Sequence, residues 1–147
     1  YVSISGLSEV LSPIAREELE HFERVLAILQ SRGKQLKKLA SPPYGSILAK
    51  NIRKKEPARM LDSFLVAGLI EARSHERMTL LSLHLTDVEL RNLYTDLLKS
   101  EARHFGVYWR LADEHFPRNI VMSRLKELAK VESDALSEMH HEPRMHS

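Results

Sequence analysis

Two short motifs of the same form constrain this chain more than any other feature of its 147 residues. Glu18 and His21 form a Glu-x-x-His motif, Glu101 and His104 form another, and each His is followed by Phe. Residues i and i+3 of an α-helix lie on one face about one turn apart, so each motif can direct a carboxylate and an imidazole at one point. That donor pair suits iron or manganese, and two such pairs facing each other form the core of di-iron carboxylate bundles.

The setting of the two motifs favours a metal site over a solvated helix face, because both motifs lie among apolar and aromatic residues. The flanking residues are Ala15, Leu19, Phe22 and Val25 for the first motif, and Tyr94, Leu97, Leu98, Phe105 and Tyr108 for the second. A third instance, Glu138 with His141, lies in a polar tail and is interpreted as coincidence. The alternative, in which both His are ordinary core or boundary residues, stays open at this point.

The remaining pattern is helical throughout and shows no strand alternation. Ser12 and Pro13 form a helix start signal, residues 1–12 are expected to be a lead-in with at most a short helix, and Gly33 supplies a stop. The other predicted helices are a short one over 44–54, long ones over about 57–83 and 87–115, and a last one from about 117. The sequence therefore predicts an all-α bundle with a long crossover connection at 34–56.

Length and composition fit one compact domain over 1–147, with 43% hydrophobic residues and no Cys. The lack of Cys excludes disulfides, zinc–thiolate sites and iron–sulfur clusters. No apolar run is long enough to cross a bilayer, so we expect no membrane association and a cytoplasmic location. The sequence leaves the oligomeric state open.

Glu71 fits the pattern of a lone bundle carboxylate, because it lies within an apolar stripe 30 residues before Glu101. A buried carboxylate must be paired or bind something. By the same logic another lone Glu should precede Glu18, but Glu9 is too close. We therefore expect that the first bundle helix, with one ligand, is missing from this chain, so that a complete site would need a substitute ligand or a partner chain.

Basic residues gather in the connection between the first two long helices and could attract a polyanion such as RNA. A solvated basic loop is an equally good interpretation, because no RNA-binding module signature is present. The residues concerned are Lys34, Lys37, Lys38, Lys50, Arg53, Lys54, Lys55 and Arg59.

Four segments together resemble one family, the bacterial tRNA 2-methylthio-isopentenyladenosine hydroxylases. The segments are residues 11–22 (LSPIAREELEHF), 70–77 (IEARSHER), 100–105 (SEARHF) and the tail 143–147 (PRMHS). The resemblance covers essentially the whole chain. It implies a ferritin-like bundle in which a non-haem di-iron centre and O2 hydroxylate the isopentenyl group of the modified adenosine beside the anticodon. His75 stands where that family is expected to have Cys, so it is either an extra ligand or a tolerated change.

The resemblance also implies roles for particular residues. The two iron ions would be bound by Glu18, His21, Glu71, Glu101 and His104. An apolar pocket for the prenyl group would be formed by Phe22, Phe64, Met78, Phe105 and Tyr108, which at helical spacing could equally be plain core. The basic connection would hold the tRNA anticodon stem-loop by its phosphates, and electrons would come from an external donor.

Two other functions remain open from the sequence. The same ligands would serve a ferritin-like protein that binds iron for storage or for peroxide removal, without an RNA surface. A metal-free helical interaction module would need neither ligands nor RNA.

Overall fold

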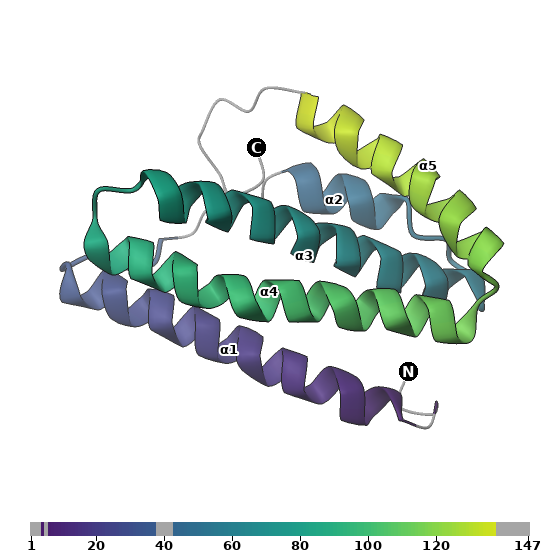
Figure 1. The fold of residues 1–147 in the computed structure, drawn as a ribbon, viewed down its shortest axis with the longest axis horizontal. Helices are drawn as coiled ribbons and strands as arrows, with labels where there is room; N and C mark the ends of the chain where they lie inside the picture. Colours follow the sequence, from purple (N-terminus) through teal and green to yellow (C-terminus); the bar gives the residue numbers. More distant parts are fainter. Residues whose placement is uncertain (1–3, 5, 38–42, 138–147) are drawn as a thin grey trace. The chain divides into compact units, whose positions relative to one another are not determined.

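The computed structural model describes residues 4, 6–37 and 43–137, and all regular structure in this part of the chain is helical (Figure 1). The helices are α1 (Leu7–Ser31), α2 (Pro43–Lys50), α3 (Ala58–His84), α4 (Val88–His115) and α5 (Arg118–Ser137). The predicted all-α class is confirmed. The chain divides into two compact units, residues 1–40 with α1 and residues 41–147 with the other four helices. The prediction of a single domain stays a prediction.

Helix α1 begins six residues earlier than the sequence predicted. Its N-cap is Gly6, whose φ of 84° is the left-handed conformation that glycine adopts most easily, and Pro13 lies inside the helix. The prediction of a start at Ser12 and Pro13 is therefore wrong. Proline inside a helix costs about 3 kcal/mol because it removes a hydrogen bond and crowds the preceding turn. Leu7 is buried ahead of it, and this burial helps to offset that cost.

The other long helices begin and end close to the predicted residues, because local signals set their ends. Asp87 is the N-cap of α4 and accepts a hydrogen bond from the backbone N–H of Leu90 at 3.0 Å. Pro57 caps α3, and Gly33, with φ of 64°, follows the end of α1. The short helix α2 covers Pro43–Lys50, so it ends four residues before the end predicted from the sequence.

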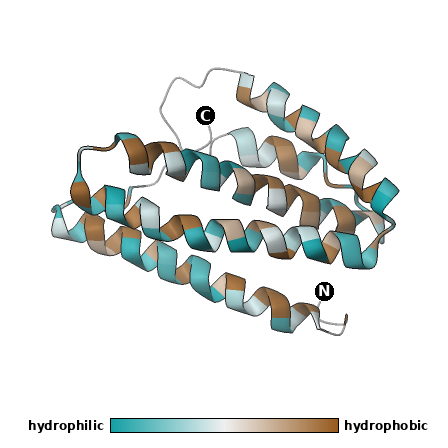
Figure 2. Ribbon diagram, viewed as in Figure 1, coloured by the Kyte–Doolittle hydropathy of each residue, from teal (hydrophilic) through white to brown (hydrophobic). Residues whose placement is uncertain are grey.

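Helices α3 and α4 run antiparallel, side by side, and are joined by the tight connection at residues 85–87 (Figure 1). Buried residues on α4 recur every three or four positions, so that helix presents one face to the interior. Hydrophobic and hydrophilic segments accordingly alternate along each helix in Figure 2. Helix α5 packs on α2 and α3, with Val121 and Leu128 fully buried, and α2 contributes Leu48, which is also fully buried.

A buried ion cluster ties the segment after α2 to α3 and α5. Asp62, fully buried on α3, accepts hydrogen bonds from the backbone N–H, Nε and Nη2 of Arg53 at 2.7–2.9 Å. Arg124 of α5 donates to the same carboxylate at 2.9 and 3.0 Å, and also to the carbonyl oxygen of Asn51 at 2.7 Å. Burial opposes ionisation, but the hydrogen bonds from both guanidinium groups outweigh it and lower the pKa of Asp62 below 3.8.

A second polar cluster joins α2, α3 and α5. The hydroxyl of Tyr44 donates to Glu132 Oε1 at 2.9 Å, and Arg73 Nε donates to the same oxygen at 3.2 Å. Arg73 also pairs with Glu76 on its own helix. Both Tyr44 and Glu132 are buried, so the shared oxygen satisfies polar groups that would otherwise be costly to remove from water.

Replacing Tyr44 with Phe should lower the free energy of unfolding by about 1 kcal/mol at neutral pH, the usual contribution of one hydrogen bond. Burial, together with the nearby Glu132 carboxylate, raises the pKa of Tyr44 above its ordinary 10.0. A raised pKa means that the folded state keeps the proton, so this stability is complete below pH 10 and is lost as the pH rises above it.

Urea unfolding of wild type and Tyr44→Phe from pH 7 to pH 11 measures both effects. The difference between the two proteins should shrink above pH 10. A difference that stays constant up to pH 11 would contradict the role assigned to this hydroxyl.

None of the helices in the described ranges is long and apolar enough to cross a membrane.

Candidate metal centre

The ligands predicted on α3 and α4 are brought together by the register of the helix pair. Glu71 and Glu101 each lie 15 residues from Thr86, in the connection between the helices. In two antiparallel helices joined by a tight turn, residues equidistant from the turn lie next to each other. His104 follows Glu101 by about one helical turn and shares its face. The sequence spacing alone thus places these three side chains at one level of the pair.

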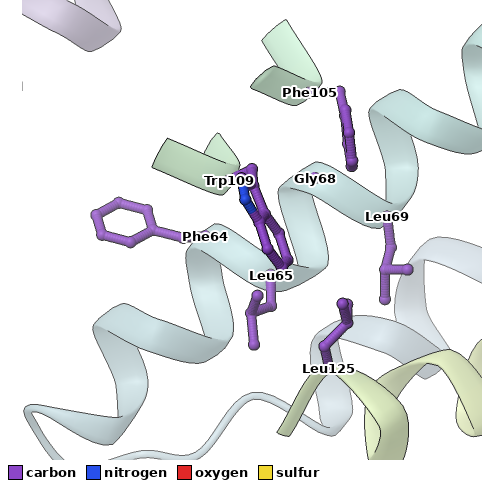
Figure 3. Close-up of a pocket in the computed structure, with 7 residues that line it drawn as sticks. All are labelled: Phe64, Leu65, Gly68, Leu69, Phe105, Trp109 and Leu125. Carbon is purple, nitrogen blue, oxygen red and sulfur yellow. The ribbon is translucent and has the colours of Figure 1, made fainter. Parts of the chain in front are cut away.

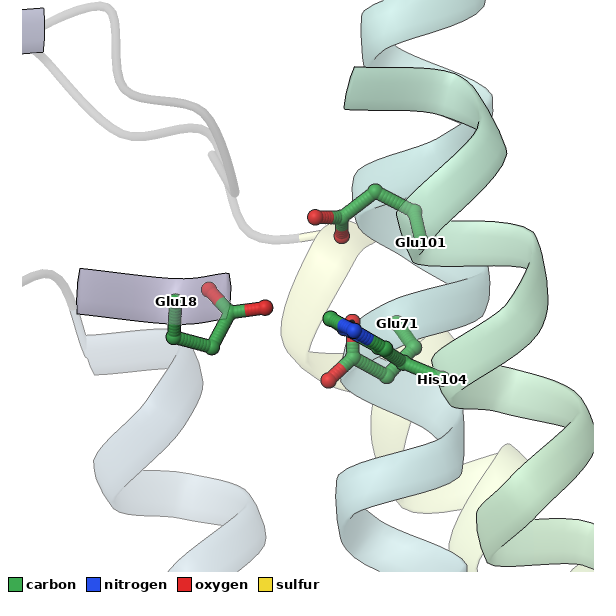
Figure 4. Close-up of side chains that lie close together, drawn as sticks. All are labelled: Glu18, Glu71, Glu101 and His104. Atoms are coloured by element: carbon green, nitrogen blue, oxygen red, sulfur yellow. Dashed lines mark ion pairs between the residues drawn. The ribbon is translucent and has the colours of Figure 1, made fainter. Parts of the chain in front are cut away.

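The structure places one ligand atom each from Glu71, Glu101 and His104 within 4.8 Å of one another. Figure 4 shows the Glu71 side chain from α3 and those of Glu101 and His104 from α4 lying close together at one side of the helix pair. His104 is fully buried and Glu101 nearly so, while the Glu71 side chain is 13% exposed. Three metal-binding groups are therefore concentrated in an interior where ionised carboxylates are expensive without a cation.

The donor set fits a divalent iron ion. His104 Nδ1 lies 3.8 Å from Glu71 Oε2, longer than a hydrogen bond. Two ligand atoms that each lie about 2.1 Å from one ion are about 3–4 Å apart, so this spacing suits shared coordination. Imidazole and carboxylate together are typical ligands of non-haem iron.

Helix α1 carries the first Glu-x-x-His motif on one face, as the spacing predicted. Glu18 Oε1 lies 3.6 Å from His21 Nδ1, and the Glu18 side chain is 47% exposed whereas that of His21 is 16% exposed. This motif belongs to the first compact unit. The third motif, at Glu138 and His141, lies outside the described residues.

His75 lies one helical turn after Glu71 on α3 and is half-buried. Its backbone oxygen accepts a hydrogen bond from Thr79 Oγ1 at 2.8 Å. Its role as an extra ligand stays a prediction.

An apolar cavity of about 30 Å³ lies between α3, α4 and α5 (Figure 3). Of the residues predicted for a substrate pocket, Phe64 and Phe105 line it. Tyr108 is not among the lining residues, although its Cβ would lie 3.7 Å from a Cβ added at Gly68, which does line the cavity. Met78 is not among the lining residues, and Phe22 belongs to α1, where it is 48% exposed.

Sequence reasoning missed five of the residues that line this cavity. These are Leu65, Gly68, Leu69, Trp109 and Leu125. Trp109 could have been found, because it follows Phe105 by four positions and therefore shares its helix face. Leu125 could not, because its approach depends on how α5 packs against α3 and α4.

The basic residues of the connection differ in their surroundings. Lys50, Lys54 and Lys55 are exposed, whereas Arg53 binds Asp62 and Arg59 donates to Glu56 at 2.7 Å. Lys34 and Lys37 are exposed in the first unit, and Lys38 lies outside the described residues.

Two curated proteins are similar to this chain over most of its length. The chain is 37% identical to a tRNA 2-(methylsulfanyl)-N(6)-isopentenyladenosine(37) hydroxylase of Pseudomonas putida, over 96% of this chain and 68% of the relative. It is 34% identical to the Salmonella typhimurium protein of the same name, over 91% of this chain but 49% of the relative. The chain thus spans between half and about two thirds of these relatives.

A solved structure covers the whole chain with a TM-score of 0.96 and 59% identity, and the match takes in 75% of that structure. It is named protein 43 with aldehyde deformylating oxygenase activity, from Synechococcus. The predicted ferritin-like class of fold is confirmed by this similarity and by the five helices of the described residues.

The family model described as tRNA-(MS2IO6A)-hydroxylase (MiaE) matches residues 1–147 in full. The resemblance noted from the four sequence segments is therefore confirmed. Because the match covers the full sequence, this chain belongs to the MiaE family of tRNA hydroxylases.

Proposed function

We propose that this chain hydroxylates the isopentenyl group of 2-methylthio-isopentenyladenosine, next to the anticodon in tRNA. The observation that carries the proposal is the buried cluster of Glu71, Glu101 and His104 in a chain of this family. The named relatives support the hydroxylase over iron storage or peroxide removal, because both are named for this reaction.

In this proposal Glu71, Glu101 and His104, together with Glu18 and His21 as the family resemblance implies, would hold two non-haem iron ions. When bound, such a pair supplies the activation of O2 that an unactivated C–H bond requires. The reaction takes one O2, two electrons and two protons. One oxygen atom enters the C–H bond to give the alcohol, the other leaves as water, and an external reductant supplies the electrons.

The protein itself would position the substrate and exclude water. Apolar side chains beside the cluster would surround the prenyl group. The exposed Lys50, Lys54 and Lys55, with Lys34, Lys37 and Lys38, would contact tRNA phosphates, which makes binding weaker at higher salt. Arg53 is engaged with Asp62, so we assign it to the fold in preference to RNA contact.

The proposal predicts that iron-loaded protein, given O2 and a chemical reductant, adds one oxygen atom to the modified nucleoside of tRNA that carries 2-methylthio-isopentenyladenosine. Mass spectrometry of the digested tRNA measures the product. Transfer RNA without the isopentenyl group is the matched control and should stay unchanged. Protein that holds iron but leaves the prenylated nucleoside unaltered would refute the proposed function.

A second candidate is deformylation of an aldehyde, because the solved relative at 59% identity carries that activity in its name. The two candidates need the same metal ligands and differ in substrate. To separate the two candidate functions, the same iron-loaded protein is supplied with a fatty aldehyde, and the loss of the formyl carbon is measured.

A further inference from the structure

The cavity between α3, α4 and α5 begins close to the ligand cluster. Gly68 precedes Glu71 by three residues on α3, and Phe105 directly follows His104 on α4. Three residues span about 4.5 Å along a helix axis, so this wall of the cavity starts within one turn of the ligands. Trp109, one turn beyond Phe105, forms a further part of the wall, and Leu125 contributes from α5 (Figure 3).

We propose that this cavity is a binding site for a short branched aliphatic group, and that Gly68 sets how large a group it accepts. The inference rests on the proposed function, because the isopentenyl group is the apolar part of that substrate. The lining side chains are aliphatic or aromatic, and larger enclosed cavities with such apolar walls stay dry and bind small hydrocarbons.

Entry to the cavity is possible at Phe105. A cavity of about 30 Å³ has room for only about two or three water molecules, so a five-carbon group needs at least one wall to move. Phe105 is 41% exposed although it lines the cavity, so its ring can change rotamer toward solvent without moving the backbone. Trp109 is held more firmly, because Arg118 lies 5.8 Å from the centre of its ring.

Gly68 keeps the space beside the ligands open. A Cβ built there would lie 3.7 Å from the Tyr108 Cβ and 3.9 Å from Phe105 Cδ2, which is ordinary contact. Alanine would therefore fit, whereas the further carbons of leucine would fill a cavity this small. Glycine inside a helix costs about 0.5–1 kcal/mol relative to alanine, so its presence in α3 has a stability cost that an open site would explain.

Trp109 is the single tryptophan of the chain, so its fluorescence reports directly on the cavity. We expect N6-isopentenyladenosine to change the Trp109 emission in a saturable way and adenosine to leave it unchanged. Gly68→Leu should weaken this binding at least about tenfold, whereas Gly68→Ala should change it little.

The matched control is Gly45→Leu on α2, where a built Cβ has no atom within 4 Å, and it should bind the probe as wild type does. Circular dichroism checks the helix content of each variant. Should Gly68→Leu fail to fold, Leu125→Phe fills the same cavity from α5 and should weaken binding in the same way. Equal binding by wild type and a folded filled variant would overturn the inference.

The inference and the proposed function fail in different ways. Probe binding that Gly68→Leu abolishes, combined with tRNA that wild type leaves unmodified, would support the cavity and reject the hydroxylase. Equal hydroxylation of tRNA by wild type and Gly68→Leu would reject the cavity and keep the hydroxylase.

Discussion

Glu101→Gln should lower the affinity of the protein for iron at least about 100-fold. Glutamine keeps the volume of the side chain but removes the charge and one of the two equivalent oxygens. Changing a residue that only orients a metal ligand already lowers metal affinity or activity by about 10–100-fold. Glu101 is expected to have a larger effect, because its carboxylate lies directly beside the ligand atoms of Glu71 and His104. We expect Glu71→Gln to behave in the same way.

Iron content after anaerobic loading, followed by removal of loosely bound metal, measures this effect. Wild type is expected to keep about two irons per chain, the number that a di-iron bundle holds. Glu138→Gln is the matched control, because it removes a carboxylate from the third Glu-x-x-His motif, and it should keep the wild-type iron content. Loss of iron in the control, or its retention in Glu101→Gln, would contradict the ligand assignment.

Asp62→Ala should lower the free energy of unfolding by about 3 kcal/mol, several times the effect of removing an exposed ion pair. Removing one partner of a buried ion pair costs about 3–5 kcal/mol, because the other charge loses its compensation. We expect a loss at the lower end of this range, because the Arg53 side chain is 45% exposed and can turn toward water when Asp62 is removed. The Arg124 side chain is only 17% exposed, so its charge would stay largely uncompensated.

Urea unfolding at pH 7 measures the loss, and Asp113→Ala is the matched control. Asp113 binds Arg118 at the surface, so its removal should cost less than about 1 kcal/mol. The pKa of Asp62 is lowered in the folded state, so its contribution is complete well above pH 3.8 and fades as the pH falls through the lowered folded pKa. Similar losses in both variants at pH 7 would show that the buried cluster adds nothing beyond an exposed pair.

The sequence predicted those parts of the structure that depend on local spacing. Residues three apart share a helix face whatever the helix packs against, so Glu101 and His104 could be paired before any fold was known. The Asp87 cap and the Pro57 start were equally local. To predict that Glu71 lies near Glu101 required one further assumption, namely that α3 and α4 are antiparallel neighbours.

Other features could not be predicted because they depend on contacts between distant segments. Asp62 gives no local sign that Arg124, 62 residues later, will approach it. Tyr44 and Glu132 are 88 residues apart. Pro13 led to a wrong prediction of where α1 begins. Its local start signal was overridden by the burial of Leu7, which lies one turn or more earlier in the helix. The cavity required α5 to be in place before Leu125 could be recognised as part of its wall.

The two acids of α3 should respond differently to selection. Asp62 is satisfied by groups within the protein, so its loss leaves fewer folded molecules. Glu71 converges with Glu101 and His104, and its loss would remove a ligand while the helices still pack. In a mutational library sorted for cellular abundance, position 62 would be intolerant and position 71 permissive. Sorting for activity would make both intolerant, so one helix can evolve under two separate pressures.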